Sequence, residues 1–235
     1  ASATDNVGVT KVEFYDGVGS RDRTIEIINN LKNKKISVFK HALNKNYSKQ
    51  RNFGLSKAKY GWVLFVDADE RVSASLQDEI LTATRRGKEY DGYFIKRRDF
   101  MWGKELRYGD TGNTKILRLA NKGKGEWNGR VHERWEIKGT LGQLDAFLMH
   151  YPHQTISEFL REVNFYTDIR ARELFDNSVR VSCLSIILYP KAKFILNYFL
   201  RLGFLDGIQG LIMAIFMSFH SFLVRGKLWK LWQGD

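Results

Sequence analysis

The chain has 235 residues, 43% of them hydrophobic, and a formal net charge of +12, which fits one large α/β domain, alone or with an appendage, and excludes a disordered chain. The single cysteine, Cys183, excludes an internal disulfide and a CxxC-type zinc site, and this is typical of a reducing compartment. The positive charge predicts an anionic partner, either a membrane surface or a phosphorylated substrate, and nucleic acid is disfavoured because no helix-turn-helix, zinc-finger or RNP-type pattern is present.

The first part of the chain alternates between strand and helix patterns, and residues 1–10 lack the basic and apolar regions of a signal peptide. The predicted elements are a strand at 11–15, a helix at 24–32, a strand at 35–41, a helix at 46–60, a strand at 62–67 and a serine-capped helix at 73–86. Residues 62–66 of this strand are all apolar, which predicts a strand buried on both faces of a parallel sheet. Strands that alternate with helices of this length indicate βαβ units and an α/β fold.

The pattern changes after residue 92. Strand-like segments at 92–100, 114–120 and 132–139 are separated by glycine-rich loops, and residues 156–177 predict an amphipathic helix. We therefore expect a catalytic-type α/β domain over residues 1–155 and a helical segment over residues 156–235.

The segment 190–232 is dense in Phe, Leu, Ile and Trp and is bounded by lysines and arginines. Its longest charge-free part, 207–224, is at the lower limit of the roughly 17–25 residues that span a bilayer. We favour helices that lie in the membrane interface, with the basic residues toward lipid headgroups. A spanning helix and an ordinary core or oligomer interface remain the alternatives.

Three acids, Asp67, Asp69 and Glu70, follow directly after the apolar residues 62–66. Residues two apart in a strand point to the same side, so Asp67 and Asp69 are expected to face one site. The carboxyl end of a parallel sheet is where α/β proteins bind ligands, and a hard divalent ion would satisfy both carboxylates. The alternative is a solvated turn before the helix that begins near Ser73.

Four stretches of the chain, taken together, resemble family 2 glycosyltransferases of the GT-A fold. They are "YDGVGSRDRTIEI", "SKQRNFGLSKAKYGWVLFVDADER", "WNGRVHERWE" and "LMHYPHQTISEFLREVNFYT". The similarity is greatest to the bacterial branch that builds the lipopolysaccharide core, whose members carry a similar hydrophobic and basic C-terminal segment. The resemblance implies a Rossmann-like, mainly parallel sheet flanked by helices. The first strand of the family, with its nucleobase-binding turn, is missing from the expected elements.

The resemblance also assigns donor and metal residues. Asp16 is similar to the acid that contacts the base or ribose of the donor. Asp67 is similar to the first acid of the DxD motif, near the ribose and the metal. Asp69 is similar to the second acid, which holds Mg²⁺ or Mn²⁺ against the diphosphate. His150 is similar to a late histidine that serves as a further metal ligand, although a loop histidine without that role is the alternative.

Lys49, Arg51 and Asn52 lie in the stretch that flanks the nucleotide in this family. The planar guanidinium of Arg51 suits diphosphate oxygens, and a solvated basic helix face is the alternative. Trp127 and Asn128 are candidates for the acceptor wall, because aromatic faces stack well on sugars, and plain core is the alternative for Trp127.

The stretch "GRVHERWE" is expected to carry the catalytic base. Glu133 matches the position of the acid that takes the acceptor's proton in GT-A enzymes. His132 is the second candidate, but neighbours in a strand point to opposite faces, so one of the two is expected to reach the site. A structural salt bridge is the alternative for both.

These features lead to a functional hypothesis. The chain is expected to be an inverting, metal-dependent hexosyl- or heptosyltransferase that moves sugar from a nucleotide-sugar donor to a lipopolysaccharide-core or related cell-envelope glycan or glycolipid. It is expected in the cytoplasm, peripheral on the anionic inner face of the bacterial cytoplasmic membrane. The alternatives are a polyprenyl-phosphate glycosyltransferase and an inactive membrane-surface binding module of the same fold.

Overall fold

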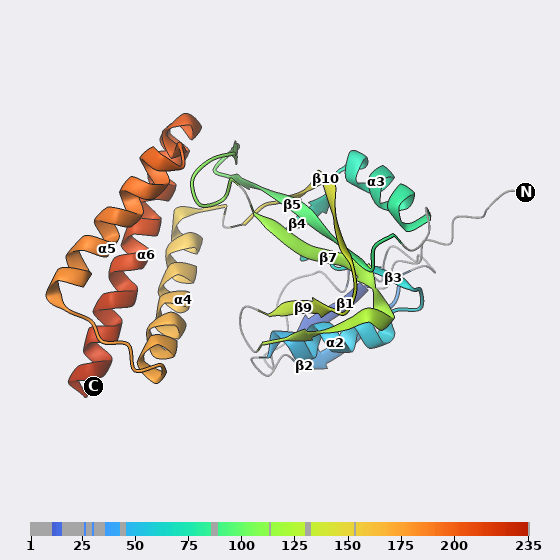
Figure 1. The fold of residues 1–235 in the computed structure, drawn as a ribbon, viewed down its shortest axis with the longest axis horizontal. Coiled ribbons are helices and arrows are strands. Elements are labelled where there is room, and N and C mark those ends of the chain that lie inside the picture. Colours follow the sequence, from blue (N-terminus) through green and yellow to red (C-terminus); the bar gives the residue numbers. More distant parts are fainter. Residues whose placement is uncertain are drawn as a thin grey trace, which may run out of the picture. The chain divides into compact units, whose positions relative to one another are not determined.

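The structure is a computed structural model that describes residues 11–15, 26, 30, 36–42, 46–85, 89–112, 114–129, 133–152 and 154–234. The architecture is α/β, with a mixed sheet flanked by helices and a C-terminal helical segment (Figure 1). The chain divides into two compact units, which are described separately. The first comprises residues 1–66, 77–95 and 116–145, and the second comprises residues 67–76, 96–115 and 146–235. The predicted division at residue 155 stays a prediction.

The first unit begins with a parallel pair of strands, β1 (Lys11–Tyr15) and β2 (Val38–Ala42). Helix α2 (Tyr47–Lys57) follows, and the side chain of Asn46 caps its first turn. The helix ends earlier than predicted, because Ala58 has an extended backbone and Lys122 Nζ donates to its carbonyl at 2.7 Å. Most of the predicted helix at 24–32 lies outside the described residues.

The main sheet has the strand order β3-β7-β5-β10-β4, and β6 pairs with β5 beside this path. Strand β3 (Trp62–Leu64) is shorter than predicted and pairs antiparallel with β7 (Lys115–Asn121). The prediction of a doubly buried parallel strand is therefore wrong for β3, whose residues are half-buried. The run is apolar for another reason, since Val63 and Phe65 pack against a buried aromatic cluster.

That cluster is the core of the first unit. The short helix η1 (Lys122–Lys124) leads from β7 into β8 (Gly125–Asn128), which pairs antiparallel with β9 (Arg134–Ile137). The buried residues of the cluster are Leu55, Ala120, Trp127 and Trp135. The indoles of Trp127 and Trp135 stack with their centroids 5.4 Å apart, so this hairpin is fixed against α2 and β7.

Four elements have residues in both units: α3 (Ala74–Arg85), β5 (Gly92–Met101), β7 and β10 (Leu141–His150). The cap predicted for α3 is present, because the hydroxyl of Ser73 accepts the N–H of Leu76 at 3.2 Å. The strands predicted at 92–100 and 114–120 are confirmed as β5 and β7, and β9 lies within the segment predicted at 132–139.

The second unit joins the end of the sheet to the C-terminal helices. Strands β4 (Glu70–Val72) and β6 (Lys104–Leu106) pair antiparallel with β10 and β5. Helix α4 (Ile156–Asp176) confirms the amphipathic prediction and starts with a capping box of Thr155 and Glu158. The core cluster of this unit consists of Met101, Leu106, Phe159, Val163 and Met213, of which Phe159 and Val163 belong to α4.

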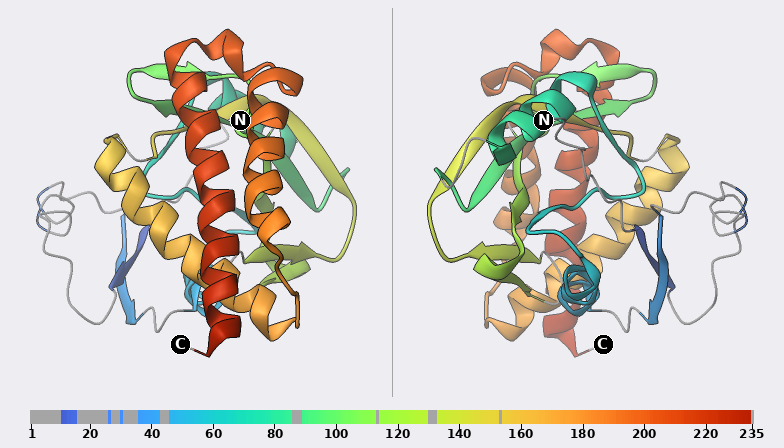
Figure 2. Two further views of the ribbon diagram at one scale, coloured as in Figure 1. Left: turned by 90° about the vertical axis from the view of Figure 1, so that its left-hand side faces the viewer. Right: turned by 90° about the vertical axis from the view of Figure 1, so that its right-hand side faces the viewer.

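Helices α5 (Cys183–Ile195) and α6 (Ile208–Gln233) form a hairpin through two short helices, η2 (Leu196–Leu200) and η3 (Gly203–Asp206). Both α4 and α5 pack against α6, which is the middle helix of this layer (Figure 2). The segments Cys183–Leu200 and Ile208–Gln233 are long and apolar enough to cross a membrane, by length and composition only.

Candidate active site

The acids Asp67 and Asp69 lie in the turn between β3 and β4, not at the end of a strand. Two hydrogen bonds close this turn. The N–H of Glu70 donates to the carbonyl of Asp67 at 3.0 Å, and the Glu70 carboxylate accepts the N–H of Asp67 at 2.9 Å. The prediction that strand alternation turns Asp67 and Asp69 to the same side is therefore wrong, because both residues lie in a turn and not in a pleated strand.

His150 connects this turn to the end of β10. In the antiparallel register of β4 and β10 it lies opposite Glu70, and its Nε2 is 3.2 Å from Asp69 Oδ2. The N–H of Tyr151 also donates to the carbonyl of Asp69 at 2.8 Å, which fixes the backbone of the turn. The structure thus brings together Asp69 and His150, two residues that the sequence predicted as metal ligands.

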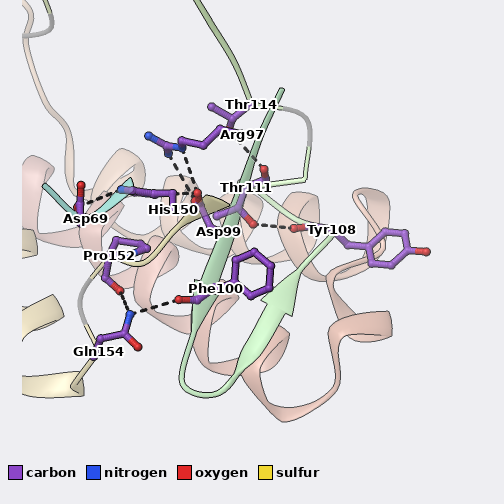
Figure 3. A network of polar contacts seen from close by, with 10 residues as sticks. All are labelled: Asp69, Arg97, Asp99, Phe100, Tyr108, Thr111, Thr114, His150, Pro152 and Gln154. Atoms are coloured by element: carbon purple, nitrogen blue, oxygen red, sulfur yellow. Dashed lines mark hydrogen bonds and ion pairs between the residues drawn. The ribbon is translucent and has the colours of Figure 1, made fainter. Parts of the chain in front are cut away.

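The other ring nitrogen of His150 points at a residue that the sequence analysis missed (Figure 3). His150 Nδ1 lies 2.8 Å from Asp99 Oδ1, and Arg97 Nε lies 3.0 Å from the same oxygen. Asp99 is only 3% exposed. The alternation of residues in β5 could have indicated Asp99. Tyr93, Ile95, Asp99 and Met101 lie on the buried side of the strand, and Asp99 is the acid among these four.

The contacts of His150 with Asp69 and Asp99 shift the pKa values of His150 and Asp69. Burial lowers the pKa of His150, but the hydrogen bonds of its ring with Asp69 and Asp99 outweigh burial and raise the pKa to about 9. The hydrogen bond from His150 lowers the pKa of Asp69, and partial burial opposes that shift. At neutral pH the pair is therefore an imidazolium and a carboxylate.

These residues fit a divalent ion. Asp69 is 48% exposed and offers carboxylate oxygen, and a deprotonated His150 offers Nε2. A carboxylate that accepts from the other nitrogen of a ligating histidine is the usual support of such a ligand, and Asp99 has that place. Within the part of the chain that the structure describes, no three His, Cys, Asp or Glu residues are grouped to hold an ion. Oxygen atoms of the diphosphate of a nucleotide-sugar donor would therefore complete the coordination.

In the first unit, the predicted base and the predicted diphosphate arginine form an ion pair. Arg51 Nε lies 2.9 Å from Glu133 Oε1, and both side chains are largely buried. The guanidinium of Arg51 also lies over the ring of Trp127, 4.7 Å from its centroid. The solvated helix face considered for Arg51 is therefore wrong, and the carboxylate of Glu133 is held in one orientation.

The remaining predicted residues have mixed positions. Asn52 brackets the backbone of Trp127, donating to its carbonyl at 2.9 Å and accepting its N–H at 2.8 Å. Trp127 is 4% exposed, so it offers little surface to a sugar in this structure. Lys49 and Asn128 are exposed, and Asn128 donates to Glu136 at 2.8 Å. Their binding roles stay predictions, and Asp16 and His132 lie outside the described residues.

Comparison with known proteins identifies the family. The model of glycosyl transferase family 2 matches residues 18–134, which include the turn with both acids and the stretch that ends in Glu133. The chain belongs to glycosyl transferase family 2. This membership implies the GT-A fold, a nucleotide-sugar donor and a glycan acceptor, and it confirms the predicted family and fold class.

Three bacterial relatives of this family 2 chain are informative. The lipopolysaccharide core biosynthesis glycosyltransferase LpsC of Rhizobium meliloti is 24% identical over 189 residues, 79% of this chain and 70% of LpsC. An uncharacterized glycosyltransferase of Rickettsia typhi is 28% identical over 197 residues, 79% of this chain and 68% of the relative. Another, from Rickettsia prowazekii, is 27% identical over 194 residues, 77% of this chain and 66% of the relative.

Proposed function

We propose that this family 2 glycosyltransferase is an inverting enzyme that transfers a hexosyl or heptosyl group from a nucleotide sugar to a lipopolysaccharide-core or related cell-envelope glycan. The observation that carries the proposal is the pairing of Asp69 with His150, which supports a site for a donor diphosphate and its metal ion. The similarity to LpsC, whose name refers to lipopolysaccharide core biosynthesis, supports the acceptor class.

Asp69 and His150, together with Asp67, would hold Mg²⁺ or Mn²⁺ at this turn. The chemistry that such an ion would supply is neutralisation of charge on the leaving nucleoside diphosphate. His150 must first lose the proton that it shares with Asp69, because an imidazolium nitrogen has no free electron pair. Asp99 keeps the ring in place during this change, since its hydrogen bond to Nδ1 involves the opposite side of the ring.

Glu133 would act as the base. The acceptor hydroxyl attacks the anomeric carbon while the bond from that carbon to the diphosphate oxygen breaks, so the configuration inverts. The hydroxyl proton passes to the carboxylate of Glu133. Arg51 holds this carboxylate from one side, through the contact between its Nε and Oε1, and limits the directions in which Glu133 can accept a proton.

We further propose that the enzyme acts in the cytoplasm, on the inner face of the bacterial cytoplasmic membrane. The two apolar helical segments and the net charge of +12 support this location, because anionic lipids attract basic surfaces. A membrane-bound acceptor would then be within reach of a peripheral enzyme.

A donor and acceptor screen tests the proposal. Nucleotide sugars are incubated with core oligosaccharide or with polyprenyl phosphate, and the anomeric configuration of the product is read by NMR. Asp69→Ala should lower transfer with added Mn²⁺ by about 100-fold or more. Asp78→Ala, at an exposed acid on α3, is the matched control and should keep full transfer. Full activity of Asp69→Ala would contradict the proposed site, and transfer to polyprenyl phosphate alone would contradict the proposed acceptor.

A further inference from the structure

Each helix of the α5–α6 hairpin exposes a row of large apolar side chains. Large apolar side chains are exposed at the same spacing on both helices, first seven residues apart and then four, which places each set on one side of its helix. They are Leu188, Ile195 and Phe199 from the α5–η2 segment and Ile208, Ile215 and Phe219 from α6. Only 6% of the window Cys183–Leu200 is buried, so α5 is not the core helix of a soluble fold.

Polar contacts tie the turn of this hairpin to the loop after β6. Asp206, which is 3% exposed, accepts the backbone N–H groups of Arg107 and Tyr108 at 2.9–3.2 Å. Lys104 Nζ donates to the carbonyl of Asp206 at 2.7 Å. Asp110 in the same loop forms ion pairs with Lys193 and Arg201 of the hairpin. The turn is therefore hydrogen-bonded and ion-paired to β6 and the charged loop that follows it.

The opposite end of the hairpin is tied to α4. Lys227 Nζ lies 2.7 Å from Asp168 Oδ1 and donates to the carbonyl of Asn164 at 2.7 Å and to the hydroxyl of Thr167 at 2.9 Å. Both ends of α6 are thus held by polar contacts within the same compact unit.

We propose that α5 and α6 lie flat on an anionic bilayer, with their shared apolar face in the acyl boundary, and do not cross it. A crossing hairpin would take its turn to the far side. It would then either carry Lys104, Arg107 and Asp110 through the hydrocarbon or break every contact of Asp206, and both are costly. A flat hairpin keeps all of these contacts, because the tied ends stay on the water side.

Charge identifies lipid as the occupant. Residues 179–234 contain seven basic side chains and a single acid, Asp206, which is buried. A second copy of this chain would bring the same positive charge to the interface and be repelled, whereas anionic headgroups attract it. Arg180 lies 3.5 Å from the ring centroid of Trp232, and Trp229, three residues earlier on α6, is exposed. Aromatic and basic residues are found together in this way at bilayer boundaries.

Vesicle binding tests the face. This inference specifies the membrane contact of the proposed function and rests on it, so Mn²⁺-dependent donor binding is measured in parallel with binding to vesicles. The full chain should bind phosphatidylcholine vesicles that contain phosphatidylglycerol and not those of phosphatidylcholine alone. The variant Phe199→Glu/Ile215→Glu should bind at least about tenfold more weakly and keep donor binding. Leu141→Glu, an exposed apolar site on β10, is the matched control and should bind like the wild type.

Labelling from one side tests the orientation. The native Cys183 is exposed at the start of α5, and Leu205→Cys in a Cys183→Ser background places a thiol at the turn. A membrane-impermeant maleimide added outside sealed vesicles should label both positions. Labelling of Leu205→Cys only after lysis would overturn the flat arrangement. Unchanged vesicle binding by Phe199→Glu/Ile215→Glu would overturn the face. If the wild type shows no Mn²⁺-dependent donor binding, that result would count against the proposed function alone.

Discussion

Asp99 holds His150 by its Nδ1 at 2.8 Å, and the opposite nitrogen of the same ring lies 3.2 Å from Asp69. The buried carboxylate of Asp99 therefore determines the orientation of the His150 ring toward Asp69. Arg97, 3.0 Å from Asp99, balances the charge of this buried carboxylate. This chain of contacts leads from β5 to the turn after β3, and the first three predictions follow from it.

The first prediction concerns Asp99 as a positioning residue. Asp99→Asn should weaken Mn²⁺ affinity by about tenfold, because an amide orients the ring less strongly than a carboxylate. Calorimetric titration of Mn²⁺ into the protein with a nucleoside diphosphate gives the affinity. The ¹⁵N chemical shifts of His150 give the tautomer, which a merely structural role for Asp99 would leave unchanged. Asp78→Asn is the control, and equal affinities in both variants would refute the role of Asp99.

The second prediction concerns the charge of His150. An NMR titration of the metal-free protein should give a pKa near 9, and Asp69→Asn should lower it, because one of the two hydrogen bonds that raise it is then weakened. A titration midpoint at the ordinary histidine value of 6.5 would show that the ring is not held between the two acids.

The third prediction gives the sign of the stability effect. Because the folded pKa is raised, the stabilisation by His150 is fully present below the unfolded pKa of 6.5 and is lost as the pH rises through about 9. Urea unfolding should show wild type more stable than His150→Gln by on the order of 3 kcal/mol at pH 6. The difference should shrink by pH 9.5, and a constant difference across this range would contradict the assigned contacts.

The fourth prediction concerns the ion pair of Arg51 and Glu133. Glu133→Gln should lower kcat by about 10²–10⁴-fold and leave donor binding intact, since the amide cannot accept the proton. Arg51→Lys should lower kcat less, because an ammonium still pairs with Glu133 but lacks the planar fork. Glu126→Gln, at an exposed position on β8, is the control. Normal turnover by Glu133→Gln would assign Glu133 a structural salt bridge only.

Local signals in the sequence predicted much of this structure. The Ser73 cap, the amphipathic α4 and the alternation of β5 each depend on neighbours a few residues away, and all three were predicted or readable. The sequence placed Asp69 and His150 in one site only through the family resemblance, since the contact joins residues 81 positions apart.

Other features depend on tertiary contacts that no local pattern records. The pair of Arg51 and Glu133 joins residues 82 positions apart, and its formation turned an expected solvated arginine into a buried one. Strand β3 was predicted too long because the apolar residues after it do not pair with another strand among the described residues. Phe65 packs against the aromatic cluster instead. Asp99 was overlooked because a single acid in a strand has no meaning until its partner is known.

The most direct test of the central claim is the coordination of Mn²⁺ by His150. Pulsed EPR of the protein with Mn²⁺ and a nucleoside diphosphate detects the ¹⁴N coupling of a ligating imidazole. The account predicts this coupling in the wild type and its loss in His150→Gln, with weakened metal binding in Asp69→Ala. Bound Mn²⁺ without any imidazole coupling, or with a coupling that persists in His150→Gln, would contradict it.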